Sequence, residues 1–282
     1  MRIAVLMTCY NRCETTLTCL RALFAQRSAA SLEVFLVDDC SPDRTGERVK
    51  AEFPLVNVIP GTGSLYWCKG MNLAWRTAGM DHDAFLWLND DVELKEDALA
   101  GLLADADATG WNGVLVGSFR DGRGRMTYGV LENESWVAPT GTPRLTDGDM
   151  SGNCVLVPRK VCEMVGIIAG DYSHGYGDYD YSARLRKANI PYYLASETCG
   201  ICDDTKRARE CALEAESLPE RLKALFRPGG RNWRDAVVYR WRHDGFWRAL
   251  MTAVHVPFFV MRSGWVRRGR AHDKTGQEDL PQ

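Results

Sequence analysis

Three groups of carboxylates have types and spacing that could do chemistry. Asn89-Asp90-Asp91 closes an apolar run, and Asp38-Asp39 closes another. Adjacent carboxylates are costly to hold together unless a cation lies beside them, and their hard oxygens suit Mg²⁺ or Mn²⁺ with a diphosphate completing the coordination shell. Either pair can instead cap a helix or a turn. The two pairs are therefore candidate metal or hydrogen-bonding sites, with capping as the open alternative.

The third group lies in Tyr176-Gly177-Asp178-Tyr179-Asp180, directly before a helical pattern. A loop that glycine makes flexible brings two carboxylates to the start of a helix. The helix dipole favours acidic residues there, which is the purely structural interpretation. The functional interpretation is a general base held beside a cleft.

Short apolar runs that alternate with helical patterns position these groups. The runs predict an α/β fold with a mostly parallel, buried sheet. Ligands of such sheets bind beyond the carboxyl ends of the strands, so the polar clusters 8–11, 38–41, 61–64 and 89–91 should converge on one edge. The expected strands are 2–8, 32–37, 56–59, 84–88, 114–117, 153–157 and 191–194. The expected helices are one with Leu17, Leu20, Leu23 and Phe24 on its apolar face, then 67–78, 95–109, 159–165 and 178–188.

Composition and charge separate the chain into two parts. It has 282 residues, of which 45% are hydrophobic and 26% charged, and this excludes a disordered, collagen-like or polytopic membrane protein. Residues 221–270 hold 12 Lys and Arg against 2 Asp and Glu, a local charge of +10, whereas residues 1–220 hold 22 against 32, or −10. We expect an acidic domain over 1–212 and a helical, basic, tryptophan-rich segment over 213–282.

The ten cysteines do not indicate a disulfide framework. Met1-Arg2 runs straight into an apolar strand without a secretory signal, and several cysteines lie inside expected core segments, where a thiol acts as a small hydrophobe. Cys199-x-x-Cys202 is a single pair and not a four-ligand zinc site. We interpret the chain as cytoplasmic and reduced.

Taken together, four motifs resemble those of the family 2 glycosyltransferases of GT-A fold. In order and spacing they are Thr8-Cys9-Tyr10-Asn11-Arg12, Val37-Asp38-Asp39-Cys40-Ser41, Asn89-Asp90-Asp91 and Gly177-Asp178-Tyr179-Asp180. Each motif alone is weak, but four in order are specific. The resemblance covers roughly residues 1–205 and implies a nucleotide-sugar-binding half over 1–117 and an acceptor half over 118–212.

The resemblance implies an inverting transfer of a sugar from a UDP- or dTDP-sugar to a hydroxyl of a glycan or lipid-linked glycan. The setting would be bacterial cell-surface polysaccharide or glycolipid synthesis. It implies Asp178 as catalytic base and Asp91 as ligand of Mn²⁺ or Mg²⁺. Donor-binding residues would be Thr8, Tyr10, Arg12, Asp39, Lys69, Asn72 and Asp90, and the acceptor side would include Asp180, His174 and Trp67.

The sequence departs from the family pattern in two places. Gly177 stands where the family usually has Glu, and the stretch 196–204 lacks the histidine that completes the metal shell in many members. Cys202 or Asp203 is a candidate replacement, and a shell of Asp91, diphosphate and water is the alternative.

Two other functions compete with glycosyl transfer. A sugar-phosphate nucleotidyltransferase needs a glycine-rich basic loop after the first strand, and residues 8–12 contain no glycine. A non-catalytic nucleotide-sugar-binding or membrane scaffold protein would not need Asp178. Nucleic-acid binding is not expected, since only the basic C-terminal segment favours it.

The C-terminal segment interleaves arginine with tryptophan and phenylalanine. Its most apolar stretch, 249–261, is too short for a spanning helix, which needs about 20 apolar residues. Amphipathic helices of this composition suit the surface of an anionic leaflet. Residues 231–268 are therefore expected to hold the enzyme at the cytoplasmic face of the inner membrane. Packing on the acidic domain or a homodimer is the alternative.

Overall fold

The computed structural model describes residues 1–203, 219, 226 and 232–258. The chain divides into two compact units, Met1–Asp204 and Thr205–Gln282. The expected boundary near residue 212 and the last part of the basic segment lie outside the described residues.

The first unit alternates strands and helices over its first half. The elements are β1 (Arg2–Cys9), α1 (Cys13–Phe24), β2 (Ser31–Asp38), α2 (Thr45–Glu52), β3 (Asn57–Pro60), α3 (Tyr66–Ala78), β4 (Ala84–Leu88), β5 (Glu93–Leu94) and α4 (Ala98–Ala108). The second half contains β6 (Val114–Arg120), β7 (Met126–Tyr128), β8 (Val130–Glu132), β9 (Ser135–Trp136), β10 (Arg144–Thr146), β11 (Asp149–Met150), β12 (Cys154–Pro158), α5 (Arg159–Val165), α6 (Gly177–Lys187) and β13 (Tyr192–Ile201).

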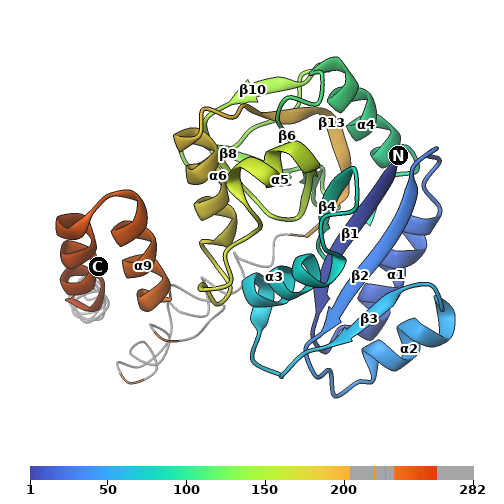
Figure 1. Cartoon of the computed structure of the whole chain (residues 1–282), viewed down its shortest axis with the longest axis horizontal. Coiled ribbons are helices and arrows are strands. Elements are labelled where there is room, and N and C mark those ends of the chain that lie inside the picture. Colours follow the sequence, from blue (N-terminus) through green and yellow to red (C-terminus); the bar gives the residue numbers. More distant parts are fainter. Residues whose placement is uncertain (204–218, 220–225, 227–231, 259–282) are drawn as a thin grey trace, which may run out of the picture. The chain divides into compact units, whose positions relative to one another are not determined.

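These strands build a central, mostly parallel sheet, as the sequence predicts. Its order is β10-β13-β6-β12-β4-β1-β2-β3 (Figure 1). β3, β2, β1 and β4 are mutually parallel, and β13 is parallel to β6. β12 runs antiparallel between β4 and β6. A small second sheet, β11-β8-β9, forms within residues 130–150.

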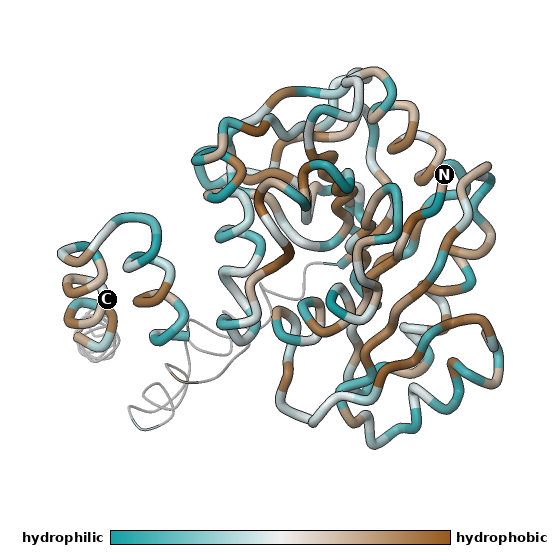
Figure 2. Tube along the Cα trace, viewed as in Figure 1, coloured by the Kyte–Doolittle hydropathy of each residue, from teal (hydrophilic) through white to brown (hydrophobic). Residues whose placement is uncertain are grey.

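Helices cover both faces of the sheet because the strand side chains alternate. Ile3, Val5 and Met7 of β1 pack with residues of α1, α2 and α4. Ala4 and Leu6 point to the other face and pack with α3, α5 and α6. The strands are apolar on both faces, so they form the hydrophobic interior that Figure 2 shows between helices of mixed polarity. The fold is therefore a three-layer α/β arrangement.

Three expectations from the sequence need correction. The strand expected at 191–194 continues to Ile201. The helix expected from residue 95 begins only at Ala98, because Lys95 still follows the pairing of β5 with β13 and donates its backbone N–H to the carbonyl of Cys199 at 2.8 Å. Phe24, expected on the buried face of α1, is exposed and stacks on Phe53 with ring centroids 5.2 Å apart.

In the second unit, α9 (Trp233–His243) is followed by a helical stretch over residues 246–258. Asn232 caps α9, its side-chain oxygen accepting a hydrogen bond from the backbone N–H of Asp235 at 3.1 Å. Among the described residues, the structure contains no helix that is both long and apolar enough to span a bilayer.

Candidate active site

The polar clusters that follow β1, β2 and β4 meet at one edge of the sheet. Cys9 pairs with Asp38 in the parallel register, and the backbone N–H of Asp39 donates to the carbonyl of Cys9 at 3.0 Å. The N–H of Asn11 donates to Ser41 Oγ at 3.0 Å. Because parallel strands end on the same side, three segments distant in sequence form one polar edge.

Arg12 joins the first of these segments to the carboxylates that follow β4. Its Nη1 atom lies 3.2 Å from Asp90 Oδ1 and 2.7 Å from Asp91 Oδ2. The guanidinium is half-buried, so its charge acts on both acids in a medium less screening than water. The cation beside the paired carboxylates is therefore the side chain of Arg12.

Asp90 is the buried member of this pair, with 6% of its surface exposed. Burial and the adjacent Asp91 raise the pKa of Asp90 to about 7, while Arg12 and the hydroxyl of Thr16 act in the opposite direction. The Thr16 hydroxyl lies 3.3 Å from Asp90 Oδ2. Asp90 is thus enclosed by protein and unsuited to direct contact with a ligand in this arrangement.

Asp91 is the more accessible member and the one that could hold a cation. Its Oδ1 atom faces Cys202 Sγ at 4.0 Å. Burial and Asp91 raise the pKa of the Cys202 thiol, which disfavours the thiolate that metals bind. Asp203 lies near Gly122, whose N–H is 3.5 Å from Asp203 Oδ1.

The described residues include no cluster of three or more His, Cys, Asp or Glu side chains that could hold a metal ion. One carboxylate nevertheless suits Mg²⁺ or Mn²⁺, because these ions commonly take one or two carboxylates together with substrate phosphates and water. Asp91 fits such a shell if phosphate oxygens supply the remaining ligands.

Asp39 organises the loop that follows β3. Its Oδ1 accepts hydrogen bonds from the N–H groups of Thr62 and Gly63, and its Oδ2 accepts from those of Leu65 and Tyr66, at 2.6–3.1 Å. The four acceptor positions of the carboxylate are therefore filled. If Asp39 binds the donor, as the family resemblance implies, one of these hydrogen bonds must be exchanged.

The side chains expected to bind the donor occupy different depths. Thr8 is buried, and Gly70 of α3 packs so closely against it that a Cβ would collide with its hydroxyl. Tyr10 is exposed beside this edge, with 55% of its surface accessible. Lys69 is half-buried on α3 and makes no ion pair within the described part of the chain. Tyr10 and Lys69 are thus the more accessible of these three residues.

Trp67 connects the polar edge to the acidic pair Asp178 and Asp180. Its indole N–H donates to Asn89 Oδ1 at 2.7 Å. Its ring lies against Gly152, where a Cβ would collide with it. The N–H of Gly152 donates in turn to Asp178 Oδ2 at 3.2 Å. A continuous path of contacts therefore runs from the end of β4 to the start of α6.

Asp178 and Asp180 differ in accessibility although one residue separates them. Asp178 is half-exposed, and its Oδ1 also accepts from the N–H of Tyr179 at 3.0 Å. Asp180 is 1% exposed, accepts from the hydroxyl of Tyr172 at 3.0 Å and pairs with Arg184 Nε at 2.9 Å. This interior position favours a positioning role for Asp180 over contact with an acceptor.

The loop before α6 is fastened to α3. Asn72 Nδ2 donates to the carbonyl of Ile168 at 2.6 Å, and Cys68 Sγ lies 3.2 Å from the carbonyl of His174. Asn72 therefore supports the loop, whereas the sequence predicts that it binds the donor. His174 belongs to this loop and is half-buried.

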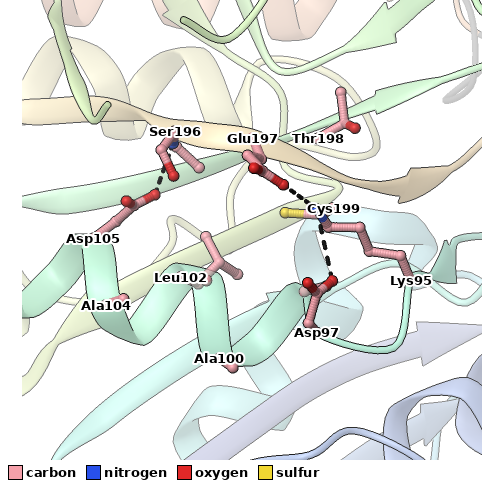
Figure 3. A pocket seen from close by; sticks show the side chains of 13 residues that line it. Lys95, Asp97, Ala100, Leu102, Ala104, Asp105, Ser196, Glu197, Thr198 and Cys199 are labelled. Atoms are coloured by element: carbon pink, nitrogen blue, oxygen red, sulfur yellow. Dashed lines mark hydrogen bonds and ion pairs between the residues drawn. The ribbon is translucent and has the colours of Figure 1, made fainter. Parts of the chain in front are cut away.

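A cavity of about 310 Å³ lies elsewhere, between α4 and β13 (Figure 3). Lys95 pairs across it with Glu197 at 2.5 Å, and Asp105 accepts from the N–H of Ser196 at 2.7 Å. None of the residues that the sequence predicts for the donor, base or metal lines this cavity. Residues 196–199 line this cavity, so the first part of the stretch 196–204 faces α4 and not Asp90 and Asp91.

Sequence reasoning missed several supporting residues. Thr16, Asn89, Gly152 and Arg184 each contact a candidate functional group, as described above. Spacing offers a signal for two of them, since Thr16 lies one turn after Arg12 and Arg184 one turn after Asp180. The roles of Asn89 and Gly152 depend on contacts between distant segments.

Solved structures of low sequence identity share this fold. S. aureus TarS 1-349 in complex with UDP matches with a TM-score of 0.55 and 16% identity over 89% of this chain and 74% of that one. TarS 1-349 with UDP-GlcNAc matches with a TM-score of 0.56 and 15% identity over 95% and 92%. The mannosyltransferase PcManGT from Pyrobaculum calidifontis, with GDP-Man and Mn²⁺, matches with a TM-score of 0.54 and 18% identity over 99% and 76%.

These likenesses define the class of protein by its fold, which is the GT-A fold of glycosyltransferases. The family model described as glycosyl transferase family 2 matches residues 4–164, more than half of the chain. The chain therefore belongs to glycosyl transferase family 2, as the motifs indicate. A search among curated proteins finds no match.

Proposed function

We propose that this protein is an inverting glycosyltransferase that moves a sugar from a nucleotide-diphosphate sugar to an acceptor hydroxyl. One observation carries the proposal. It is the series of contacts Asn89–Trp67–Gly152–Asp178, which links a half-exposed carboxylate to the polar edge that includes Asp91. A donor at that edge and an acceptor at Asp178 would then lie on either side of Trp67.

The donor side is formed by exposed Tyr10, the loop that Asp39 holds, and two cations. Arg12 and Lys69 supply positive charge toward a diphosphate, and Arg12 can transfer one of its contacts from Asp91 to phosphate. Neighbours of the same fold were solved with UDP, UDP-GlcNAc and GDP-Man, which supports a nucleotide-sugar donor. We favour a UDP- or dTDP-sugar from the sequence resemblance.

Asp91 would hold Mn²⁺ or Mg²⁺ together with the diphosphate. When bound, the cation would neutralise the negative charge that develops on the departing diphosphate. Mn²⁺ in the PcManGT structure supports this assignment. Asp90 stays buried behind Asp91, and Arg12, which contacts both carboxylates, orients that of Asp91.

Asp178 takes the proton of the acceptor hydroxyl as its oxygen attacks the anomeric carbon from the face opposite the diphosphate. Such base catalysis contributes about 10²–10⁴-fold. The Gly152 N–H donates to the carboxylate and orients it at the start of α6. Displacement from the opposite face inverts the anomeric configuration, and no covalent intermediate with the enzyme is needed.

The test combines a donor screen with two variants. Purified full-length protein is incubated with nucleotide sugars and Mn²⁺, and release of nucleoside diphosphate and the product anomer are followed by NMR. We expect Asp91→Asn to lose metal-dependent nucleotide affinity by roughly 10²-fold, as loss of a metal-site residue does. Asp97→Asn is the matched control, because Asp97 is an exposed carboxylate beside the α4 cavity. Unchanged metal-dependent affinity in Asp91→Asn would remove Asp91 from the metal site.

The acceptor is proposed to be a glycan or lipid-linked glycan of a bacterial surface polysaccharide or glycolipid. A lipid-linked acceptor would place the reaction at the cytoplasmic face of the inner membrane, where the basic C-terminal unit would hold the enzyme. A homodimer through that unit is the alternative partner.

A further inference from the structure

The helical stretch 246–258 of the C-terminal unit has apolar side chains on two opposite faces. One face packs inward: Ala249 is buried, and Ala253 and Val256 are half-buried. The indole N–H of Trp233 on α9 donates to the carbonyl of Ala253 at 3.1 Å and joins the two helices on this side. This face accounts for the packing of the helix pair.

The opposite face is exposed and apolar. We call it the apolar stripe: Trp247, Leu250, Met251, Val254 and Phe258. Spacings of 3, 4, 7 and 11 residues from Trp247 place them within one face of about 100°. Trp247 is 73% exposed and Val254 61%. Phe246 extends the surface beside the stripe, its ring centroid 5.1 Å from that of Trp247 and 5.8 Å from that of Trp241.

The charges around the apolar stripe are positive. Arg248 and Arg242 are exposed, and Arg240 pairs with Asp244. Asp235, the other acidic residue of this described stretch, is 1% exposed. Residues 221–270 carry a net charge of +10 in the sequence, so the stripe belongs to a strongly basic segment.

We propose that the apolar stripe inserts into the interface of an anionic lipid surface, with the helix 246–258 lying parallel to the membrane. Apolar side chains at this spacing enter the boundary of headgroups and acyl chains, and arginines beside them contact anionic headgroups. The described part of this helix does not span a bilayer, since its 13 residues measure about 20 Å against a hydrocarbon core of about 30 Å.

The positive charge of this segment favours a membrane over a second copy of this chain as the partner of the apolar stripe. A two-fold dimer through the apolar stripe would bring the same basic segment against itself, and like charges oppose each other. An anionic leaflet supplies the opposite charge and an apolar layer in one surface. The proposal rests on this unit alone and does not depend on the sugar chemistry.

Co-sedimentation of the full-length protein with vesicles tests the proposal. The protein should pellet with mixed phosphatidylglycerol–phosphatidylcholine vesicles and much less with phosphatidylcholine alone, and salt should weaken the binding. The double variant Trp247→Glu/Val254→Glu should lose about 100-fold in partitioning, because each of the two apolar side chains withdrawn costs about tenfold. Arg248→Gln should lose about fivefold at low salt, the equivalent of ~1 kcal/mol.

Leu55→Glu is the matched control. Leu55 is 90% exposed in the first unit, so the same chemical change there should leave vesicle binding unchanged. Circular dichroism and light scattering establish that each variant keeps its helix content and mass. The proposal is overturned if the wild-type protein stays in the supernatant with anionic vesicles, or if Leu55→Glu weakens binding equally. It is also overturned if the double variant changes a dimer to a monomer without affecting partitioning.

Discussion

The first unit, Met1–Asp204, contains two acidic pairs, Asp90 with Asp91 and Asp178 with Asp180, and in each pair one carboxylate is buried and the other half-exposed. Their sequence surroundings are alike, since each lies where a strand or loop leads into the next element. The buried member of each pair is held by an arginine. Arg12, from the segment that follows β1, holds Asp90, and Arg184, one turn further along α6, holds Asp180.

The arginines hold their acids differently. Arg12 uses one nitrogen for both carboxylates of its pair and is half-buried. Arg184 contacts Asp180 through Nε and donates through its two Nη atoms to the carbonyls of Val165 and Ile167. Arg12 can therefore change partners when a ligand arrives, whereas Arg184 fastens a loop. We therefore expect the first pair to exchange an ion-pair partner when a ligand binds, and the second to position the candidate base Asp178.

Asp178→Asn should have the largest effect and tests the second half of this comparison. The amide cannot accept the acceptor proton, so turnover should fall about 10²–10⁴-fold. Donor affinity should stay within a few-fold, because the donor edge lies on the other side of Trp67. Steady-state rates and nucleotide titration separate the two effects. Near wild-type transfer by Asp178→Asn would remove it as the base.

Arg184→Met should have the largest effect on stability. The substitution leaves Asp180, which is 1% exposed, without its cation and leaves two loop carbonyls without a donor. Loss of one member of a buried ion pair costs about 3–5 kcal/mol. Denaturant unfolding measures this loss. A loss below ~1 kcal/mol would show that Arg184 does not fasten the loop.

Arg12→Met should destabilise less, by about 1–2 kcal/mol, because Asp90 can take up a proton. With a pKa near 7 in the folded chain and a lower one when unfolded, Asp90 binds more protons in the native state. The free energy of unfolding should therefore fall as pH rises through 7, and more steeply in Arg12→Met, where the attraction that lowers this pKa is gone. Unfolding between pH 6 and 8 without divalent cations measures it. A loss in Arg12→Met that does not vary with pH would contradict this account.

Much of the fold could be predicted because parallel strands are buried on both faces and appear as continuous apolar runs. β4, predicted at 84–88, has those bounds in the structure. β13 was truncated in the prediction because Glu197, Thr198 and Gly200 interrupt its apolar run, and its pairing with β6 shifts register there. The two-residue strand β5 carries no periodicity that a sequence could show.

The convergence of polar clusters on one edge also follows from topology, and the structure confirms it. The sequence cannot show which hydrogen-bond donors each carboxylate accepts from. Asp38 and Asp39 are adjacent, yet Asp38 accepts from the N–H groups of Ser41 and Gly46 while Asp39 accepts from the loop 62–66. Such differences depend on loop conformations set by contacts between segments distant in the chain.

The smallest expected effect concerns Gly177, which stands at the start of α6 where the family usually has Glu. A Cβ at Gly177 would lie 2.5 Å from Cys68 Sγ and 3.3 Å from Ile168 Cδ1. Cys68 is fully buried, so it cannot move aside easily. The close approach of α3 therefore explains why this chain has no side chain beside its candidate base.

Gly177→Ala should thus cost about 1 kcal/mol of unfolding free energy through overpacking, although alanine favours a helix over glycine by a similar amount. In a Cys68→Ala background the obstructing sulfur is gone, and the same substitution should become neutral or stabilising. Gly101→Ala on α4 is the control, because nothing lies within 4 Å of its Cβ and it should stabilise in both backgrounds. Denaturant unfolding of this double-mutant cycle measures the coupling between positions 68 and 177. If Gly177→Ala stabilised the wild-type chain as much as Gly101→Ala does, the contact with Cys68 would not constrain position 177. The start of α6 would then not be held firmly enough for the second acidic pair to position a base.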